Sequence, residues 1–298
     1  MKLSYSKEVK FSLIKRKPIL ALESTIITHG LPEPQNLKLA LELESIAREL
    51  GVTPATIAIM NGVIKVGLER DEIKHLASLK TCYKFSSFDI PIALGLSLTG
   101  STTVAGTSHI AHKAGIKVFS TGGIGGVHKE ESSRMDISHD LKSLSFTPIV
   151  LVSSGAKCIL DLESTVEQLE TLGIPHLGWK TKELPAFYYN KSGIPLPYQA
   201  DNINQITSVA RNLESSALLV ANPIPKEAEL SKEWIEELIK EAHEKAKEEK
   251  ILGKALTPYL LSYLWKKSEG RTLETNCALI RSNVKLGSQI CRDLHSSS

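Results

Sequence analysis

The chain has 298 residues, with 36 Lys and Arg against 33 Asp and Glu, so its formal net charge is +3. This near balance, with the two signs interspersed, argues against a nucleic-acid-binding surface, and no apolar run reaches the roughly 18 residues of a membrane span. The 4 Cys residues lie far apart without a CxxC pair, which favours a reduced, cytoplasmic setting and implies neither a disulfide framework nor a zinc cage.

Strand and helix patterns alternate along the chain, which predicts an α/β fold. A short apolar strand at 19–22 precedes a polar loop, and a helix opens at Pro34 and ends at Gly51. A tight turn at Asn61-Gly62 is predicted between two strands. The other clear elements are strands 56–60 and 63–66, helices 71–79 and 103–114, strands 116–120 and 148–152, helix 161–172 and strand 218–220.

The C-terminal half contains two further features. Residues 180–205 are rich in Pro, Tyr and Asn without a clear period, which predicts a long functional loop rather than a linker. Ser231 is predicted to cap the longest helix of the chain, 232–250, which has one apolar face and a solvated face of Glu and Lys. Without internal repeats, we expect a single domain over 1–298, in which 1–17 form an N-terminal extension.

Glu23 directly follows the predicted strand at 19–22. Ligands of α/β sheets bind at the carboxyl ends of strands, and a carboxylate at the end of an apolar strand can have a raised pKa and act as a general acid or base. The alternative, which the sequence alone favours, is a loop carboxylate that accepts backbone N–H groups with Ser24 and Thr25 as helpers.

Lys157 lies in a stretch of small and apolar residues with no other charge before Asp161. Burial would disfavour its charged form and leave a neutral, nucleophilic amine, which is how imine-forming lysines arise. The alternative is a lysine that reaches water from the start of a helix. The sequence leaves both interpretations open.

A glycine-rich loop, Thr121 to His128, follows the strand at 116–120. A dinucleotide fingerprint requires G-x-G-x-x-G at the start of a helix, but the third glycine position holds His128 and the next strand ends in serines rather than an acid. A nicotinamide-dependent dehydrogenase is therefore disfavoured. Two interpretations remain, a loop whose backbone N–H groups approach an oxyanion and a flexible turn.

The segment from Asp136 to Asp140 supplies two carboxylates, a hydroxyl and an imidazole within a few residues. A lone carboxylate with waters suits a hard, weakly held cation such as Mg²⁺ or Mn²⁺. The alternative is a helix start, because Ser138 and Asp140 are both good N-caps before Leu141. No pair of histidines has the spacing of a zinc-binding HExxH motif, so a histidine-based zinc site is not predicted.

Several motifs follow one another in a characteristic order between about residue 18 and about residue 290. They are Ala21–Ile27, His29-Gly30, Pro34–Asn36, Pro54–Ala58, Thr121–His128, Asp136–Ser138, Gly155–Lys157, Asn222–Pro225 and Thr257-Pro258. In this order they resemble pseudouridine-5′-phosphate glycosidase, the indigoidine-synthase-A-like family. Because many motifs match in register, this resemblance is far more specific than any single loop.

The resemblance implies a three-layer α/β/α sandwich around a mostly parallel mixed sheet, a homotrimer, and one Mn²⁺ per subunit, with Mg²⁺ as the alternative metal. It also implies reversible cleavage of the C–C glycosidic bond of pseudouridine 5′-phosphate to uracil and ribose 5-phosphate. The expected class is therefore a glycosidase or lyase acting on a C-glycosyl bond. The alternative is a non-catalytic protein of the same fold that binds a sugar phosphate or nucleotide.

The resemblance also implies roles for individual residues. Glu23 falls on the proton donor, Lys157 on the covalent nucleophile and Asp136 on the metal ligand. The substrate-binding and site-lining positions are Lys84, Val104, His128, Ser138, His139, Asp140 and Asn276. Ordinary glycosidases protonate a leaving heteroatom, but here the scissile bond joins two carbons. An imine between Lys157 and the ring-opened ribose offers another route, in which uracil leaves as Glu23 protonates its C5 and water then hydrolyses the imine.

This chain departs from the family pattern at three places. The family usually shows Ser-Arg-Arg-Asp after the binding lysine, whereas Lys84 is followed by Phe-Ser-Ser-Phe-Asp at 85–89. His139 stands where Ala is common, a position expected to contribute its backbone. Ser153-Ser154-Gly155 replaces a more apolar run before the nucleophile.

Overall fold

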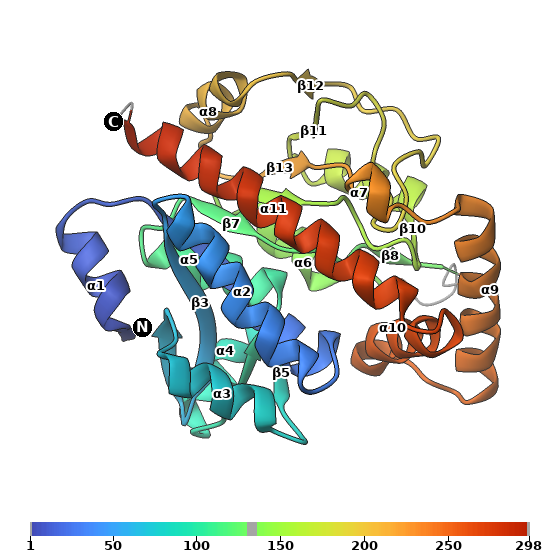
Figure 1. The fold of residues 1–298 in the computed structure, drawn as a ribbon, viewed down its shortest axis with the longest axis horizontal. Helices are drawn as coiled ribbons and strands as arrows, with labels where there is room; N and C mark the ends of the chain where they lie inside the picture. Colours follow the sequence, from blue (N-terminus) through green and yellow to red (C-terminus); the bar gives the residue numbers. More distant parts are fainter. Residues whose placement is uncertain (1, 130–135, 297–298) are drawn as a thin grey trace.

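A large mixed β-sheet forms the centre of the structure, a computed structural model that describes residues 2–129 and 136–296 (Figure 1). Its strands are β1 (Leu3–Tyr5), β2 (Ile19–Glu23), β3 (Thr53–Met60), β4 (Val63–Val66), β5 (Tyr83–Phe85), β6 (Gly100–Thr102), β7 (Val118–Ser120), β9 (Val150–Ser153), β11 (His176–Trp179), β12 (Gln199–Ala200) and β13 (Leu218–Ala221). They lie in the order β1-β4-β3-β2-β7-β9-β13-β11-β12, with β6 beside β3 and β5 beside β6. Strands β8 (Val127–His128) and β10 (Leu160–Asp161) form a separate antiparallel pair.

The central strands β2, β7, β9 and β13 run parallel to one another, so their carboxyl ends meet at one edge. In the described part of this sheet, the antiparallel neighbours are β4 and β6, which both pair with β3. The residues of β9 and β13 are all buried, as expected for strands covered on both faces.

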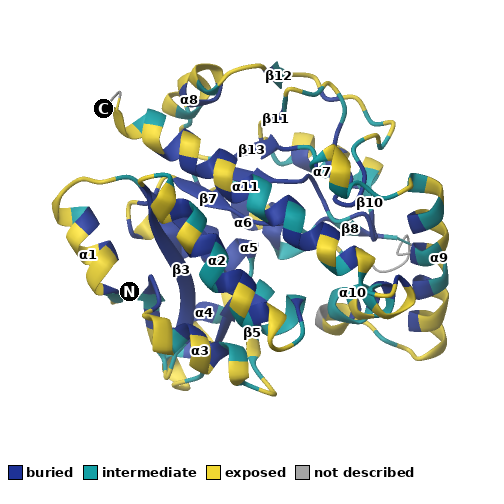
Figure 2. Ribbon diagram, in the orientation of Figure 1, coloured by how far each residue is buried: buried dark blue, intermediate teal, exposed yellow. Residues whose placement is uncertain are grey.

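Helices cover both faces of the sheet. They are α1 (Lys7–Ile14), α2 (Gln35–Glu49), α3 (Arg70–Ser78), α4 (Ile90–Gly95), α5 (Val104–Lys113), α6 (His139–Leu144), α7 (Leu162–Thr171), α8 (Ile203–Arg211), α9 (Lys232–Glu248), α10 (Leu256–Lys267) and α11 (Arg271–Ser296). Helices α2 and α11 pack together on one face and α5 and α6 on the other (Figure 1). Figure 2 shows that α2 and α11 turn their buried residues toward the sheet and their exposed ones outward. The predicted three-layer α/β/α architecture is thus confirmed.

Local signals in the sequence placed several elements correctly. Asn61 and Gly62 both have positive φ, 50° and 70°, as a tight turn between the antiparallel strands β3 and β4 requires. The Ser231 hydroxyl accepts the backbone N–H of Trp234 and caps α9 as predicted. The prediction that this is the longest helix is wrong, because α9 has 17 residues and α11 has 26.

Two segments contain more regular structure than the sequence indicates. The predicted loop 180–205 contains β12 and the start of α8, and the loop part before them reaches the cavity described below. Residues of the predicted N-terminal extension form β1, which pairs in parallel with β4, and α1, whose Val9 is fully buried. None of the helices described here is both long and apolar enough to cross a membrane.

Candidate active site

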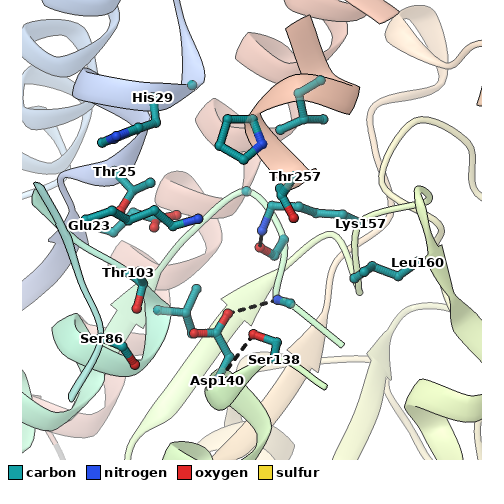
Figure 3. A pocket seen from close by; sticks show the side chains of 18 of the residues that line it. Glu23, Thr25, His29, Ser86, Thr103, Ser138, Asp140, Lys157, Leu160 and Thr257 are labelled. Carbon is teal, nitrogen blue, oxygen red and sulfur yellow. Dashed lines mark hydrogen bonds between the residues drawn. The ribbon is translucent and has the colours of Figure 1, made fainter. Parts of the chain in front are cut away.

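A cavity of about 360 Å³ opens at the carboxyl ends of the central strands, below α10 (Figure 3). All the site residues predicted from the sequence line it, namely Glu23, Lys84, Val104, His128, Asp136, Ser138, His139, Asp140, Lys157 and Asn276. These residues come from segments far apart in the chain, and the parallel arrangement of β2, β7 and β9 brings three of the segments together.

Glu23 is the last residue of β2, and its carboxylate accepts a hydrogen bond from the Thr121 hydroxyl just beyond β7. Burial raises the pKa of the Glu23 carboxyl, and the nearby Lys157 and the Thr121 hydroxyl oppose that rise. A carboxyl whose pKa is raised keeps its proton to higher pH and can therefore donate it at a pH at which an exposed glutamate is ionised.

The alternative interpretation of Glu23 as a loop carboxylate helped by Ser24 and Thr25 is wrong. The Ser24 hydroxyl donates to the carbonyl of Ile57 at 2.5 Å, and the Thr25 hydroxyl donates to the carbonyl of Thr102 at 2.7 Å. Both hydroxyls therefore fasten the end of β2 to neighbouring strands, and the carboxylate of Glu23 is left to face the cavity.

Lys157 follows β9, is half-buried, and points into the same cavity as Glu23 (Figure 3). Its Nζ donates a hydrogen bond to the carbonyl of Gly123. The residue does not start a helix, so the interpretation as a helix-start lysine is wrong. The Lys157 amine therefore shares one cavity with the Glu23 carboxyl, whose pKa is raised.

The glycine-rich loop presents a carbonyl to this amine. The N–H of Ile124 donates to the carbonyl of Gly155 at 3.1 Å, and the N–H of Gly125 donates to the Asp140 carboxylate at 3.0 Å. Both N–H groups are engaged within the protein, which disfavours the oxyanion interpretation at these two positions. A Cβ on Gly123 would lie 2.6 Å from the Phe187 ring, so close packing explains the glycine there.

The Asp140 carboxylate ties two segments of the site together. It accepts the N–H of Ala105 at 2.9 Å as well as that of Gly125, so it links the first turn of α5 to the glycine-rich loop. Of the two predicted caps, Ser138 caps α6, because its hydroxyl accepts the N–H of Asp140 at 3.2 Å (Figure 3).

Positive charge and a helix N-terminus gather at one side of the cavity. Val104 is the first residue of the ten-residue helix α5, which Thr103 caps, and Lys84 lies on β5 nearby. Burial, followed by the charge of Lys84, lowers the pKa of His29, which favours the neutral imidazole. A cation beside a helix N-terminus is suited to bind a phosphate.

His139 contacts the segment in which the chain departs from the family pattern. Its Nε2 lies 3.0 Å from the Ser87 hydroxyl, and its ring meets the Phe88 ring edge-on at 4.9 Å between centroids. Both His139 and Phe88 line the cavity. The side chain of His139, rather than its backbone alone, therefore shapes this wall.

His128 and Asn276 are buried, each 8% exposed, and both line the cavity. The Oδ1 of Asn276 has no hydrogen-bond partner among the described residues, so it can accept from a ligand. Sequence reasoning did not assign His29, Phe187 and Thr257 to the site, although His29 and Thr257 lie in motifs that carry the resemblance.

Asp136 is half-buried at the cavity wall, and its backbone carbonyl accepts the N–H of His128 at 3.0 Å. No group of three or more His, Cys, Asp or Glu side chains that could hold a metal occurs in residues 2–129 and 136–296. A single carboxylate fits a hydrated Mg²⁺ or Mn²⁺ ion, which keeps most of its waters, rather than zinc.

The fold and the site define an α/β protein with an acid and an amine in one cavity at the carboxyl edge of its sheet. A model of the family described as indigoidine synthase A like protein matches residues 8–293, and the chain belongs to this family.

Relatives and solved structures agree with this membership. A pseudouridine-5′-phosphate glycosidase of Petrotoga mobilis is 44% identical over 98% of this chain and 97% of the relative, and one of Legionella pneumophila is 47% identical over 97% and 94%. An indigoidine synthase A-like protein of Thermotoga maritima superposes with a TM-score of 0.88 at 36% identity, covering 94% of each chain. The prealnumycin C-glycosynthase AlnA, solved with ribulose 5-phosphate, gives a TM-score of 0.90 at 35% identity, over 99% of this chain and 97% of that one.

Proposed function

We propose that this chain is a pseudouridine-5′-phosphate glycosidase, which reversibly cleaves pseudouridine 5′-phosphate to uracil and ribose 5-phosphate. The observation that carries the proposal is the pairing of Glu23, whose pKa is raised, with the Lys157 amine in one cavity. Relatives of 44% and 47% identity that bear this name, matched over nearly their whole length, support it. We also place the enzyme in the cytoplasm, the setting that the dispersed cysteines favour.

Lys157 acts as the nucleophile. Opening of the ribose ring breaks the bond between C1′ and the ring oxygen, and the electron pair of this bond stays on the oxygen. The lone pair of Nζ forms a bond to C1′, and a proton that Nζ loses passes to the ring oxygen, which becomes a hydroxyl. The lone pair of this nitrogen then forms a C=N bond as the bond between C1′ and C5 of uracil breaks. Water adds to the resulting imine and releases ribose 5-phosphate and the free amine of Lys157.

Glu23 supplies the proton that the departing base needs. The electron pair of the broken bond passes to uracil, whose C5 takes the proton of the Glu23 carboxyl. Because burial raises the pKa of this carboxyl, the protonated form persists at a pH at which an exposed glutamate would be ionised. In the reverse direction the same carboxylate removes the C5 proton.

The phosphate binds at the positive side of the cavity. Lys84 offers a point charge, and the Val104 N–H at the start of α5 and the Ser138 hydroxyl offer hydrogen-bond donors. The next N–H of α5, that of Ala105, binds the Asp140 carboxylate instead. His128 and Asn276 line the remaining wall, where the buried Oδ1 of Asn276 is suited to accept an N–H of the base.

Asp136 would hold one Mn²⁺ per subunit, or Mg²⁺, through one carboxylate and bound waters. The ion supplies positive charge that offsets the phosphate and orients groups around it. The chemical steps themselves are assigned to Lys157 and Glu23.

The active form is a homotrimer, as the resemblance implies, and exposed apolar residues at and beside α4 support self-association. Ile92 lies on α4, Phe88 in the 3-10 turn before it and Leu96 directly after its end, and they are 54%, 51% and 66% exposed. Sedimentation of the wild type should give a trimer, and Ile92→Glu should dissociate it. Val209→Glu, at an exposed apolar residue on α8, is the control. A wild-type monomer contradicts this assignment.

An assay for free uracil tests the proposed function. Incubation with pseudouridine 5′-phosphate should release uracil and ribose 5-phosphate in equal amounts, and mixing the two products should form the substrate. A non-catalytic sugar-phosphate-binding protein would bind ribose 5-phosphate, for example by calorimetry, and release no uracil. The absence of uracil at high enzyme concentration with Mn²⁺ present would refute the glycosidase assignment.

A further inference from the structure

Asn283 lies in the middle of α11, outside the cavity, yet its side chain is completely buried at the carboxyl ends of the central strands. A buried amide must find partners for two N–H groups and an oxygen, or its burial is costly. The partners of Asn283 lie in the segments that follow three different strands, β7, β9 and β13.

The donor side of this amide holds the segment after β7. Its Nδ2 donates to the carbonyl of Thr121 at 2.8 Å and lies 3.3 Å from the carbonyl of Gly122. The backbone carbonyl of Asn283 also accepts the Ser120 hydroxyl at 3.0 Å. Three consecutive residues at the end of β7 are therefore fixed to one point of α11.

The acceptor side holds the segments after β9 and β13. Its Oδ1 accepts from Asn222 Nδ2 at 2.8 Å. The Ser154 hydroxyl lies 3.3 Å from Oδ1 and 3.2 Å from Nδ2, so it either donates to the amide oxygen or accepts from the amide nitrogen. This explains two features of the sequence that the catalytic roles leave unused, the asparagine of the Asn222–Pro225 motif and the serine that replaces a more apolar residue before Lys157.

The fixed segments are the ones that hold the two reacting side chains. Thr121 donates to the Glu23 carboxylate, and Gly123, next to Gly122, accepts from Lys157 Nζ. We infer that Asn283 is a positioning residue that sets the separation and orientation of Glu23 and Lys157 through Thr121 and the glycine-rich loop. This inference rests on the proposed function, since it concerns the two residues assigned to the chemistry.

The decisive variants change the hydrogen bonding of Asn283 and keep its size. Asn283→Asp keeps an acceptor for Asn222 but loses the Nδ2 donor, which lies within hydrogen-bond distance of the Thr121 and Gly122 carbonyls and the Ser154 hydroxyl. Asn283→Leu removes both the donor and the acceptor. Val284→Ala is the matched control, because Val284 is the next residue on α11, is 1% exposed, and contacts the core without such bonds. The activity of each variant is assayed at a temperature below the midpoint of its own thermal unfolding.

We expect both Asn283 variants to lower kcat about 10- to 100-fold with KM within about threefold, since misplaced groups slow the chemistry while the phosphate contacts stay. The basic limb of the pH profile of kcat/KM, which reports the ionisation of Glu23, should move to higher pH. The reason is that the Thr121 hydrogen bond, which lowers the pKa of Glu23, is loosened. In a Thr121→Val background, the uncharged variant Asn283→Leu should shift this limb no further. Equal kcat loss in Val284→Ala, or an unmoved limb, overturns the inference.

A second readout needs no substrate and so separates this inference from the proposed function. Lys157 can be labelled with acetic anhydride and the labelling rate read by mass spectrometry. The rate should rise in Asn283→Asp, because the carbonyl of Gly123 no longer holds the amine, and it should stay at the wild-type value in Val284→Ala. If the labelling rate in Asn283→Asp is unchanged, the inference is overturned, whether or not the enzyme releases uracil. If the labelling rate rises but the enzyme releases no uracil, only the proposed function is refuted.

Discussion

Replacing Asp140 tests how the site is built, because its carboxylate is the shared acceptor of two backbone N–H groups. Asp140→Ala leaves the N–H groups of Ala105 and Gly125 without this acceptor at a position that is only 8% exposed. A hydrogen bond to a charged group contributes about 1.5 to 3 kcal/mol, so the free energy of unfolding should fall by about 3 to 6 kcal/mol. Asp140→Asn, which keeps one acceptor oxygen, should lose about half as much.

Urea denaturation of the wild type and the variants measures this loss, provided that the slope of the unfolding free energy against urea concentration is the same in all of them. Asp161→Ala is the control, because the Asp161 carboxylate accepts only one backbone N–H, that of Ser164 at the start of α7, together with the Ser164 hydroxyl. The control should lose about 1 kcal/mol, as a typical helix cap does. If Asp140→Ala is no less stable than Asp161→Ala, the carboxylate does not tie α5 to the glycine-rich loop.

The variant Asp140→Asn also tests the electrostatics of the site. The negative charge of Asp140 is one of the causes that raise the pKa of Glu23, so Asp140→Asn should lower that pKa. The proton donor is active below its pKa, and activity is lost as the pH rises through it. The basic limb of kcat/KM for uracil release should therefore move to lower pH in Asp140→Asn, and a limb that moves upward contradicts the reasoning.

Three further predictions concern the chemistry. Glu23→Gln should lower uracil release by about 10²- to 10⁴-fold, the usual contribution of a general acid, while ribose 5-phosphate still forms the imine; near wild-type release would reassign the acid. Lys84→Ala should raise KM about 10-fold or more with a smaller effect on kcat, and an unchanged KM would place the phosphate elsewhere. Exhaustive chelation should reduce activity and added Mn²⁺ should restore it, whereas the activity of Asp136→Ala should not respond to added Mn²⁺. Full activity after chelation would contradict the proposed role of the metal.

The edge of the sheet that carries the site could be predicted from the sequence because its strands are plain apolar runs followed by polar residues. The apolar strand at 19–22 is followed by Glu23, and the apolar strand at 148–152 is followed by two serines and then, after Gly155 and Ala156, by Lys157. In parallel strands such ends share an edge, so both side chains were placed near one another without any knowledge of their contacts.

Helix α11 could not be predicted in the same way, because its buried face is partly polar. Asn283 and Ser288 are completely buried, and Thr275 is 3% exposed, so the apolar period that reveals a helix is broken. The hydrogen bonds of these side chains join residues far apart in the chain. Asn283 and Thr121 are 162 positions apart, and Thr275 and Ala228 are 47 apart. Only the folded chain reveals them.

The partner of Glu23 was also beyond sequence reasoning. Ser24 and Thr25 were the nearest hydroxyls along the chain, but both fasten β2 to the carbonyls of neighbouring strands. The hydroxyl that reaches the carboxylate belongs to Thr121, 98 positions away. Local sequence marks Glu23 and Lys157 as candidates here, and the register of the parallel strands determines what surrounds them.

The covalent role of Lys157 is tested most directly by reduction with borohydride in the presence of ribose 5-phosphate, followed by peptide mass spectrometry. If the amine of Lys157 attacks the opened pentose, reduction should leave an adduct on Lys157 in the wild type and no adduct in Lys157→Ala. An enzyme that releases uracil but carries no adduct on Lys157 under these conditions would contradict the account.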